Sequence, residues 1–138
     1  MAIAGFTGDD GAGAATACAA GKFKAALGDA VCGDCAVNTY ATSTVAAPSI
    51  ACDDCVANTE TAAVASAAAT ECKAVAGFTG ADGVAPSACV ADTFKAASGS
   101  ADCTACPSNT VTVREIGQTE VVACVANNNF YGLRGEAA

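Results

Sequence analysis

The sequence predicts a small, disulfide-rich protein of mostly β-hairpins and irregular loops, arranged as an elongated rod of serial cysteine-rich modules. Three observations predict this class: ten cysteines in 138 residues, few large apolar side chains, and an internal repeat. Leu, Ile, Val and Phe together number 23 while Ala alone numbers 37, so the hydrophobic fraction of 53% overstates the available core volume. Covalent closure must therefore replace part of the missing core.

The repeat divides the chain into two long units. Gly-Phe-Thr-Gly at residues 5–8 returns at residues 77–80, and the cysteines that follow keep their spacing. Cys18, Cys32 and Cys35 correspond to Cys89, Cys103 and Cys106, each 71 residues later. The first long repeat spans residues 1–76, with a cysteine-free loop and three disulfide loops. The second, truncated repeat spans residues 77–138, with a cysteine-free loop, two disulfide loops and a tail.

A shorter unit repeats inside each long one. In six places a cysteine is followed three residues later by Gly, Asn or Asp, which tolerate positive φ and form tight turns. These residues are Gly21, Asn38, Asn58, Asp92, Asn109 and Asn127. Each short unit is therefore expected to be a cysteine, a turn, a short extended piece, a second turn and another cysteine, which predicts irregular hairpins and little helix.

The cysteine spacing favours one disulfide pairing without selecting it. Ten cysteines allow roughly 945 pairings, and sequence alone cannot choose among them. Nearest-neighbour pairing closes every short unit in the same way and leaves no cysteine over. It gives Cys18–Cys32, Cys35–Cys52, Cys55–Cys72, Cys89–Cys103 and Cys106–Cys124, with two-residue joints at 33–34, 53–54 and 104–105. A loop of about 15 residues closed in this way gains roughly 3 kcal/mol in the chain-entropy model.

Structural zinc is the main alternative use of these cysteines. Cys32, Cys35, Cys52 and Cys55 have the spacing of a four-thiolate zinc ribbon. That site would leave other cysteines as free thiols, and the chain has no histidine to complete a second one. We expect no metal and no cofactor, although adventitious calcium at the acidic turns (Asp9-Asp10-Gly11 and Asp53-Asp54) stays open as an alternative.

The segment from Glu60 to Ala76 is ambiguous. Its many alanines favour a helix that would end at Gly77. The competing interpretation is a third disulfide loop whose variable positions have become alanine. A Cys55–Cys72 bond holds its Cα atoms about 5.5 Å apart, which leaves room for one or two helical turns only.

Charge and composition exclude several classes of function. The net charge of −8 argues against nucleic acid, whose binding needs basic patches. The longest weakly polar run, residues 62–69, is too short to span a bilayer, so no membrane insertion is expected. Without histidine, a hydrolytic triad lacks its usual base. We therefore expect no enzyme.

Several motifs resemble a known repeat family. They are Gly77-Phe78-Thr79-Gly80 with Asp82-Gly83, Lys22-Phe23-Lys24-Ala25-Ala26 after Cys18, Cys106-Pro107-Ser108-Asn109-Thr110, and Asn129-Phe130-Tyr131-Gly132. With these motifs the chain resembles the ephrin-receptor-like cysteine-rich repeats, akin in style to tumour-necrosis-factor-receptor modules and abundant in algal and protist surface proteins. In that family a cysteine usually precedes the Gly-Phe-Thr-Gly motif by three residues, where this chain has Ala2 and Ala74. The cysteine that closes the same loop is absent too, which is what loss of a whole disulfide predicts.

The resemblance is specific to the pattern of small units and does not point to a function. A rod of serial modules has a large exposed surface and no pocket large enough for chemistry, so we expect an extracellular structural or scaffold protein, non-catalytic, that serves as a subunit of a surface filament or matrix. One alternative is an accessory or linker subunit of a larger complex, such as one on the lumenal side of an algal membrane. Another is an adhesive or ligand-binding module. The expected location is extracellular or the cell surface, with the oxidising lumen of an organelle as the alternative.

The expected partners are proteins, through self-assembly or a larger complex. The aromatic residues that we expect to make contacts are Phe6, Phe78, Phe130 and Tyr131, unless each packs on the disulfide of its own module. The Thr42-Ser43-Thr44 cluster near Pro48 has a composition suited to O-glycans.

Overall fold

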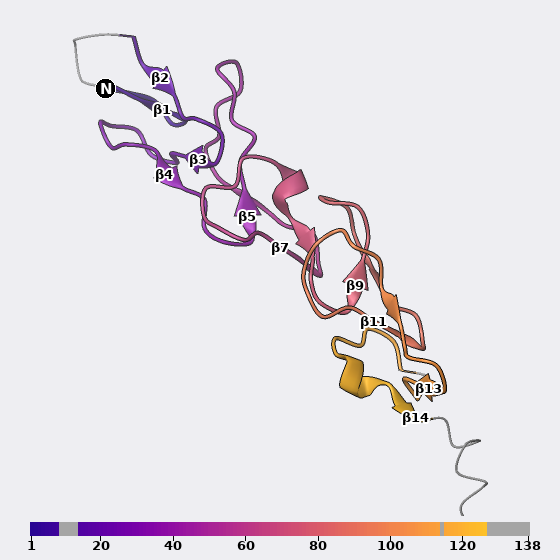
Figure 1. Ribbon diagram of the computed structural model, residues 1–138. Helices are drawn as coiled ribbons and strands as arrows, with labels where there is room; N and C mark the ends of the chain where they lie inside the picture. The colour runs from indigo at the N-terminus through magenta and orange to yellow at the C-terminus, as the bar shows by residue number, and fades with distance from the viewer. Residues whose placement is uncertain (9–13, 114, 127–138) are drawn as a thin grey trace, which may run out of the picture. The chain divides into compact units, whose positions relative to one another are not determined.

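The computed structural model of the chain describes residues 1–8, 14–113 and 115–126 (Figure 1). Its strands are two residues long, and its two 3₁₀ helices are three residues long. The elements are β1 (Phe6–Thr7), β2 (Thr16–Ala17), β3 (Lys22–Phe23), β4 (Gly33–Asp34), β5 (Thr39–Tyr40), β6 (Asp53–Asp54), β7 (Thr59–Glu60), η1 (Ala69–Glu71), β8 (Lys73–Ala74), β9 (Phe78–Thr79), β10 (Ser87–Ala88), β11 (Thr93–Phe94), β12 (Thr104–Ala105), β13 (Thr110–Val111), η2 (Val121–Ala123) and β14 (Val125–Ala126).

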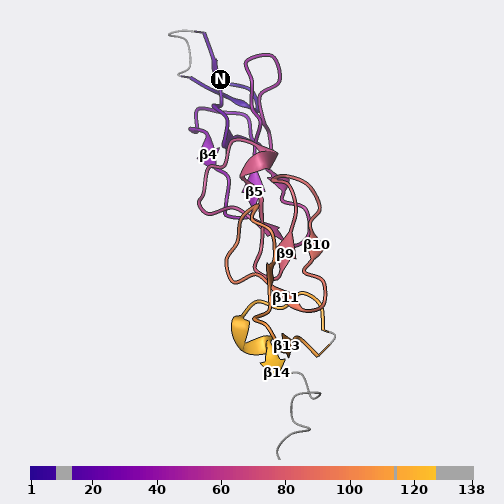
Figure 2. The same cartoon turned by 45° about the vertical axis from the view of Figure 1, so that its right-hand side comes forward.

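Each strand pairs with its neighbour in the chain, which gives seven two-stranded sheets. In the first hairpin Phe6 faces Ala17, and in the equivalent hairpin of the second long repeat Phe78 faces Ala88. Figure 2 shows β9 beside β10, its partner in that hairpin. The prediction of a small, disulfide-rich protein of short β-hairpins is confirmed.

The two-residue joints between disulfide loops are themselves strands. The joint at 33–34 is β4, the joint at 53–54 is β6 and the joint at 104–105 is β12. Each pairs with the strand that follows the preceding tight turn. A joint is therefore the second strand of one hairpin, and the cysteine after it begins the next.

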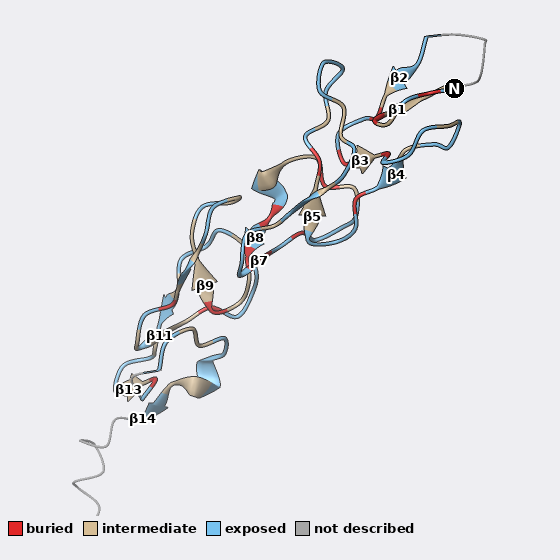
Figure 3. Ribbon diagram, turned by 180° about the vertical axis from the view of Figure 1, so that it is seen from behind, coloured by how far each residue is buried: buried red, intermediate tan, exposed pale blue. Residues whose placement is uncertain are grey.

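Cysteine, alanine and threonine fill the interior in place of large apolar side chains. The largest side chains that are fully buried are those of Thr112, Cys35, Cys72 and Cys89. Large aliphatic side chains remain outside: Val31 is 80% exposed and Val45 is 84% exposed. Figure 3 shows the buried residues as short red segments within a ribbon that is mostly exposed or half-buried.

The chain divides into two compact units. The first comprises Met1–Lys73 with Ala81–Ala85, and the second comprises Ala74–Gly80 with Pro86–Ala138. Within the first unit, the Gly83 amide donates to the carbonyl of Cys72 at 2.9 Å, and the Lys73 ammonium pairs with the Asp82 carboxylate at 2.6 Å. These contacts attach the 81–85 segment to the end of the third disulfide loop.

The alanine-rich segment from Glu60 to Ala76 contains only one short helical turn, η1. Figures 1 and 2 show it as the pink coil near β5. The bond between Cys55 and Cys72 holds their Cα atoms 5.7 Å apart, so the segment must return to its starting point within 17 residues. That constraint overrides the helix propensity of its alanines.

Candidate functional site

Five disulfides close five of the seven hairpins. They are Cys18–Cys32, Cys35–Cys52, Cys55–Cys72, Cys89–Cys103 and Cys106–Cys124, with Cα separations of 5.6–5.8 Å. These are the pairs that nearest-neighbour closure predicts, and all ten cysteines, every one in the described part of the chain, are used. A zinc ribbon would need four thiolates from Cys32, Cys35, Cys52 and Cys55, and each of these sulfurs is already bonded to another sulfur.

Four of the disulfides have one fully buried partner and one half-buried partner. The buried partners are Cys18, Cys35, Cys72 and Cys89. In the fifth disulfide both Cys106 and Cys124 are half-buried. A disulfide with a buried sulfur is also the apolar centre of its hairpin, because cysteine behaves as a small hydrophobe when it is buried.

The turn after each cysteine has the backbone conformation that its residue types predict. All five predicted turn residues in the described part of the chain have positive φ, as do Gly5 and Gly77 of the two cysteine-free loops. The values are 79° at Gly5, 80° at Gly21, 66° at Asn38, 62° at Asn58, 79° at Gly77, 66° at Asp92 and 68° at Asn109. Asn127 lies outside the described residues. Seven modules can therefore be counted, each beginning three residues before such a turn residue.

Each of the seven turns in the described part of the chain is closed by one backbone bond, and five of them are joined to the next module by another. In the third module, the Thr39 amide donates to the carbonyl of Ala36 at 3.2 Å and closes the turn around Asn38. The Cys55 amide then donates to the carbonyl of Asn38 at 2.9 Å. The same two bonds recur at Gly5, Gly21, Gly77 and Asp92, and they join each of these modules to the one that follows it.

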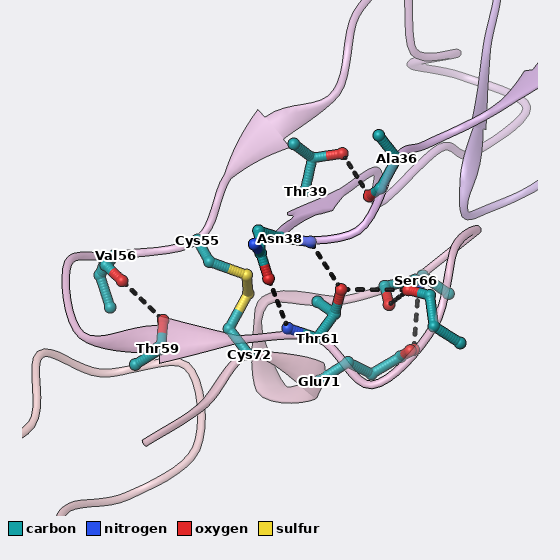
Figure 4. Close-up of a disulfide and its surroundings, with 12 residues drawn as sticks. Ala36, Asn38, Thr39, Cys55, Val56, Thr59, Thr61, Ser66, Glu71 and Cys72 are labelled. Carbon is teal, nitrogen blue, oxygen red and sulfur yellow. Dashed lines mark hydrogen bonds between the residues drawn. A yellow bond between two sulfur atoms is a disulfide. The ribbon is translucent and has the colours of Figure 1, made fainter. Parts of the chain in front are cut away.

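Side chains add a second connection in two places. The backbone amide of Asn38 donates to Thr61 Oγ1 at 2.8 Å, and the backbone amide of Thr61 donates back to the side-chain oxygen Oδ1 of Asn38 at 3.4 Å (Figure 4). Asp92 and Thr112 repeat the arrangement in the second unit, at 2.8 and 3.0 Å. Both threonines are buried.

Where the turn residue is glycine, its amide bonds to a backbone carbonyl of the next module and not to a threonine hydroxyl. The residue that supplies this carbonyl is the seventh of the next module. Gly21 donates its amide to the carbonyl of Ala41 at 2.8 Å. Gly5 and Gly77 donate to the carbonyls of Lys24 and Lys95 in the same manner, at 2.8 and 2.9 Å. Sequence reasoning missed this pattern, although a signal existed: Asn38 and Asp92 have Thr at the matching position of the next module, whereas Gly5, Gly21 and Gly77 have Lys or Ala there. Asn58 departs from the pattern, because its matching position is Gly80.

The aromatic residues expected to make contacts are not among the strongly exposed side chains. Phe6 on β1 and Phe78 on β9 are half-buried, whereas Phe130 and Tyr131 lie outside the described residues. The exposed apolar side chains are aliphatic instead, including Val31, Val45 and Val122. Composition alone could not separate these valines from core residues.

The acidic and hydroxyl clusters take defined places. Asp53 and Asp54, candidates for a calcium turn, form the exposed strand β6, whereas Asp9 and Asp10 lie outside the described residues. Over the ranges that the structure describes, no group of three or more His, Cys, Asp or Glu side chains is placed to hold a metal ion. Thr42 and Thr44 are exposed, whereas the Ser43 hydroxyl donates to the carbonyl of Cys18 at 2.6 Å.

A known family matches part of the second long repeat. Residues 80–124 match the family described as tyrosine-protein kinase ephrin type A/B receptor-like. The matched segment contains the Cys89–Cys103 and Cys106–Cys124 disulfides. No curated protein matches the sequence. None of the helices in residues 1–8, 14–113 and 115–126 has the length and hydropathy that crossing a bilayer requires.

These findings agree on a coarse assignment. Modules of this kind are receptor-like and non-catalytic. A framework in which every cysteine is oxidised belongs to an extracellular or otherwise oxidising compartment. The matched segment and the disulfide-closed hairpins of the first unit follow one pattern, so the chain is a cysteine-rich, disulfide-bonded protein with an ephrin-receptor-like segment at residues 80–124.

Proposed function

We propose that this protein is a non-catalytic structural module of an extracellular assembly, such as a surface filament or matrix, in which it spaces or joins other components. The observation that carries the proposal is the use of every cysteine to close the same small hairpin. Modules built on the same turn and the same hairpin give similar surfaces within each compact unit, which suits assembly through many similar contacts.

The buried side chains support this proposal. The largest fully buried side chains form disulfides or bonds between modules; they are Cys35, Cys72, Cys89 and Thr112. An enzyme or a small-molecule receptor usually gathers polar side chains in a concave pocket lined by large apolar ones. Here the large apolar side chains that could line such a pocket point outward.

An adhesive or ligand-binding role is the second candidate, and the exposed aliphatic side chains favour it. Val31, Val45 and Val122 are each more than 70% exposed. Exposed apolar groups mark interaction sites when they gather into a patch. The same side chains would serve self-association equally well, so solution behaviour must separate the two roles.

Sedimentation velocity and electron microscopy of the purified, oxidised protein test the proposal. A structural subunit is expected to form concentration-dependent polymers or to co-assemble with other matrix components. A protein that stays monomeric over a wide concentration range, and binds one partner saturably, would refute self-assembly and support the ligand-binding role. Co-purification in fixed stoichiometry with a membrane complex would instead identify an accessory or linker subunit.

A further inference from the structure

Two of the lysines in this chain are buried. Lys24 and Lys95 are each only 5% exposed, and they occupy equivalent positions 71 residues apart. By contrast, the side chains of Lys22 and Lys73 are 42% and 48% exposed and pair with Asp34 and Asp82. Among the described residues, no carboxylate lies within ion-pair distance of either buried ammonium group. A charge buried without its counter-ion must be compensated by hydrogen bonds.

Backbone carbonyls supply that compensation. Lys24 Nζ donates to the carbonyl of Phe6 at 2.8 Å and to the carbonyl of Gly28. An ammonium group has three N–H donors, so these two bonds use most of its capacity. The Gly28 amide in turn donates to the carbonyl of Ala2 at 2.9 Å, which ties the loop after Lys24 to the start of the first hairpin.

The second long repeat has the same arrangement. Lys95 Nζ donates to the carbonyls of Phe78 at 2.7 Å, of Ala74 at 3.4 Å and of Gly99. The Gly99 amide donates to the carbonyl of Ala74 at 2.8 Å. The contact is therefore a property of the long repeat, since it recurs at equivalent positions with equivalent partners.

The two hairpins held by these lysines are the two that lack a disulfide. Ala2 and Ala74 stand four residues before β1 and β9, as Cys18 stands four residues before β3. Ala15 and Pro86 directly precede β2 and β10, as Cys32 directly precedes β4. The missing cysteines would therefore occupy residues 2 and 15, and residues 74 and 86.

We propose that the Lys24 and Lys95 ammonium groups are latches that compensate for the missing disulfides. Each fastens the first strand of a cysteine-free hairpin, without a covalent bond, to the loop that follows the lysine in the next module. Hydrogen bonds from a charged donor are stronger than neutral ones, especially where water is excluded. A latch of this kind can open and close again without redox chemistry, whereas a disulfide cannot. The β1–β2 and β9–β10 hairpins are therefore the places where the folded chain opens locally.

Amide hydrogen exchange of a Lys24→Met variant tests the latch. Methionine keeps most of the aliphatic length and removes all three donors. The reporters are the amides of Gly5 and Cys18, which bond at the base of the β1–β2 hairpin, and the Cys35 amide is the internal reference. Exchange at Gly5 and Cys18 is expected to accelerate roughly 10- to 100-fold, the loss expected for hydrogen bonds to a charged group. Exchange at Cys35 should stay within about twofold of wild type.

Lys22→Met is the matched control, because Lys22 lies two residues away, is solvent-exposed, and its ammonium group bonds to Asp34 alone among the described residues. It should leave Gly5 and Cys18 unchanged. Equal acceleration in both variants, or no acceleration in Lys24→Met, would overturn the proposal. Lys95→Met repeats the test in the second unit, with the Cys89 amide as reporter.

Restoring the disulfide gives an independent test. In the triple variant Ala2→Cys/Ala15→Cys/Lys24→Met, a sixth disulfide is expected to form and to return exchange at Gly5 and Cys18 to near the wild-type rate. This variant also decides the matter if Lys24→Met alone does not fold. Failure of the triple variant to fold, or fast exchange in spite of a sixth disulfide found by peptide mapping, would contradict the assignment.

Discussion

The contact between Asn38 and Thr61 is a sharp test of how successive modules are joined. Thr61 is buried, and its hydroxyl accepts the Asn38 amide at 2.8 Å while it donates to the carbonyl of Ala63 at 3.0 Å (Figure 4). A Thr61→Ala variant removes both bonds. The Ala63 carbonyl keeps a donor, because the Ser66 hydroxyl also reaches it at 3.4 Å. The Asn38 amide has no such substitute.

The expected loss of stability in Thr61→Ala comes from the Asn38 backbone N–H, which is left without an acceptor. A buried amide without an acceptor costs about 1–3 kcal/mol, and because the bond from Asn38 to Thr61 is only part-buried, we expect a loss of stability near the lower end of that range. A variant that also carries Asn38→Gly should recover part of this loss, since it recreates the pairing of Gly21 with Ala41, where the glycine amide reaches the alanine carbonyl at 2.8 Å. Residues in direct contact couple by about 0.5–3 kcal/mol, so the double variant should be more stable than the two single losses predict when added.

Differential scanning calorimetry of the oxidised protein measures this cycle, because a change of about 1 kcal/mol moves Tm by roughly 4–8 °C in a domain of this size. Thr39→Ala is the matched control: its hydroxyl makes only an exposed bond to the carbonyl of Ala36 at 2.9 Å. The reasoning is refuted if Thr61→Ala lowers Tm no more than Thr39→Ala does, or if the Asn38→Gly and Thr61→Ala effects simply add.

Three further variants probe the turns and the disulfides, each by thermal unfolding of the oxidised protein. Gly21→Ala should destabilise the protein far more than Gly28→Ala, because a Cβ at Gly21 would lie 2.0 Å from the carbonyl oxygen of Ala65, whereas a Cβ at Gly28 would meet nothing within 4 Å. Gly28→Ala then costs only its backbone strain, about 1–3 kcal/mol. A larger loss of stability in Gly28→Ala would contradict this account. Asn58→Gly should be nearly neutral and Asn58→Val should lose about 1–2 kcal/mol, since φ at this position is 62°; equal stabilities would show that the turn does not need its left-handed residue. Removal of one disulfide by Cys35→Ser/Cys52→Ser should lower the free energy of unfolding by about 2–4 kcal/mol. Lys22→Met, which removes an exposed ion pair, should lower it by about 0–1 kcal/mol. A larger loss in Lys22→Met would contradict the view that disulfides stabilise this fold more than surface ion pairs do.

Local chemistry explains why so much of the fold could be predicted from the sequence. Gly21, Asn38 and Asp92 each specify a turn from within four residues of chain, and the nearby cysteines place the hairpin strands on either side. Nearest-neighbour disulfide pairing was favoured over the other possible pairings because it closes every short unit in the same way, and the structure has those five pairs. The helix propensity of residues 60–76 left that segment ambiguous, and the disulfide limits it to one short helical turn, as the pairing of Cys55 with Cys72 predicts.

The contacts between modules depend on groups that are far apart in the sequence. Asn38 meets Thr61 across 23 residues, and Lys24 reaches the carbonyl of Phe6 across 18. The residues beside Lys24 and Lys22 do not show that the first is buried and the second exposed, although only Lys24 recurs as a lysine, Lys95, in the second long repeat. The sequence by itself determined the hairpins and their covalent closure, since both follow from spacing along the chain. Only the tertiary structure decided which polar groups lose water and bond to each other, because that depends on how one folded module presents its carbonyls and amides to the next.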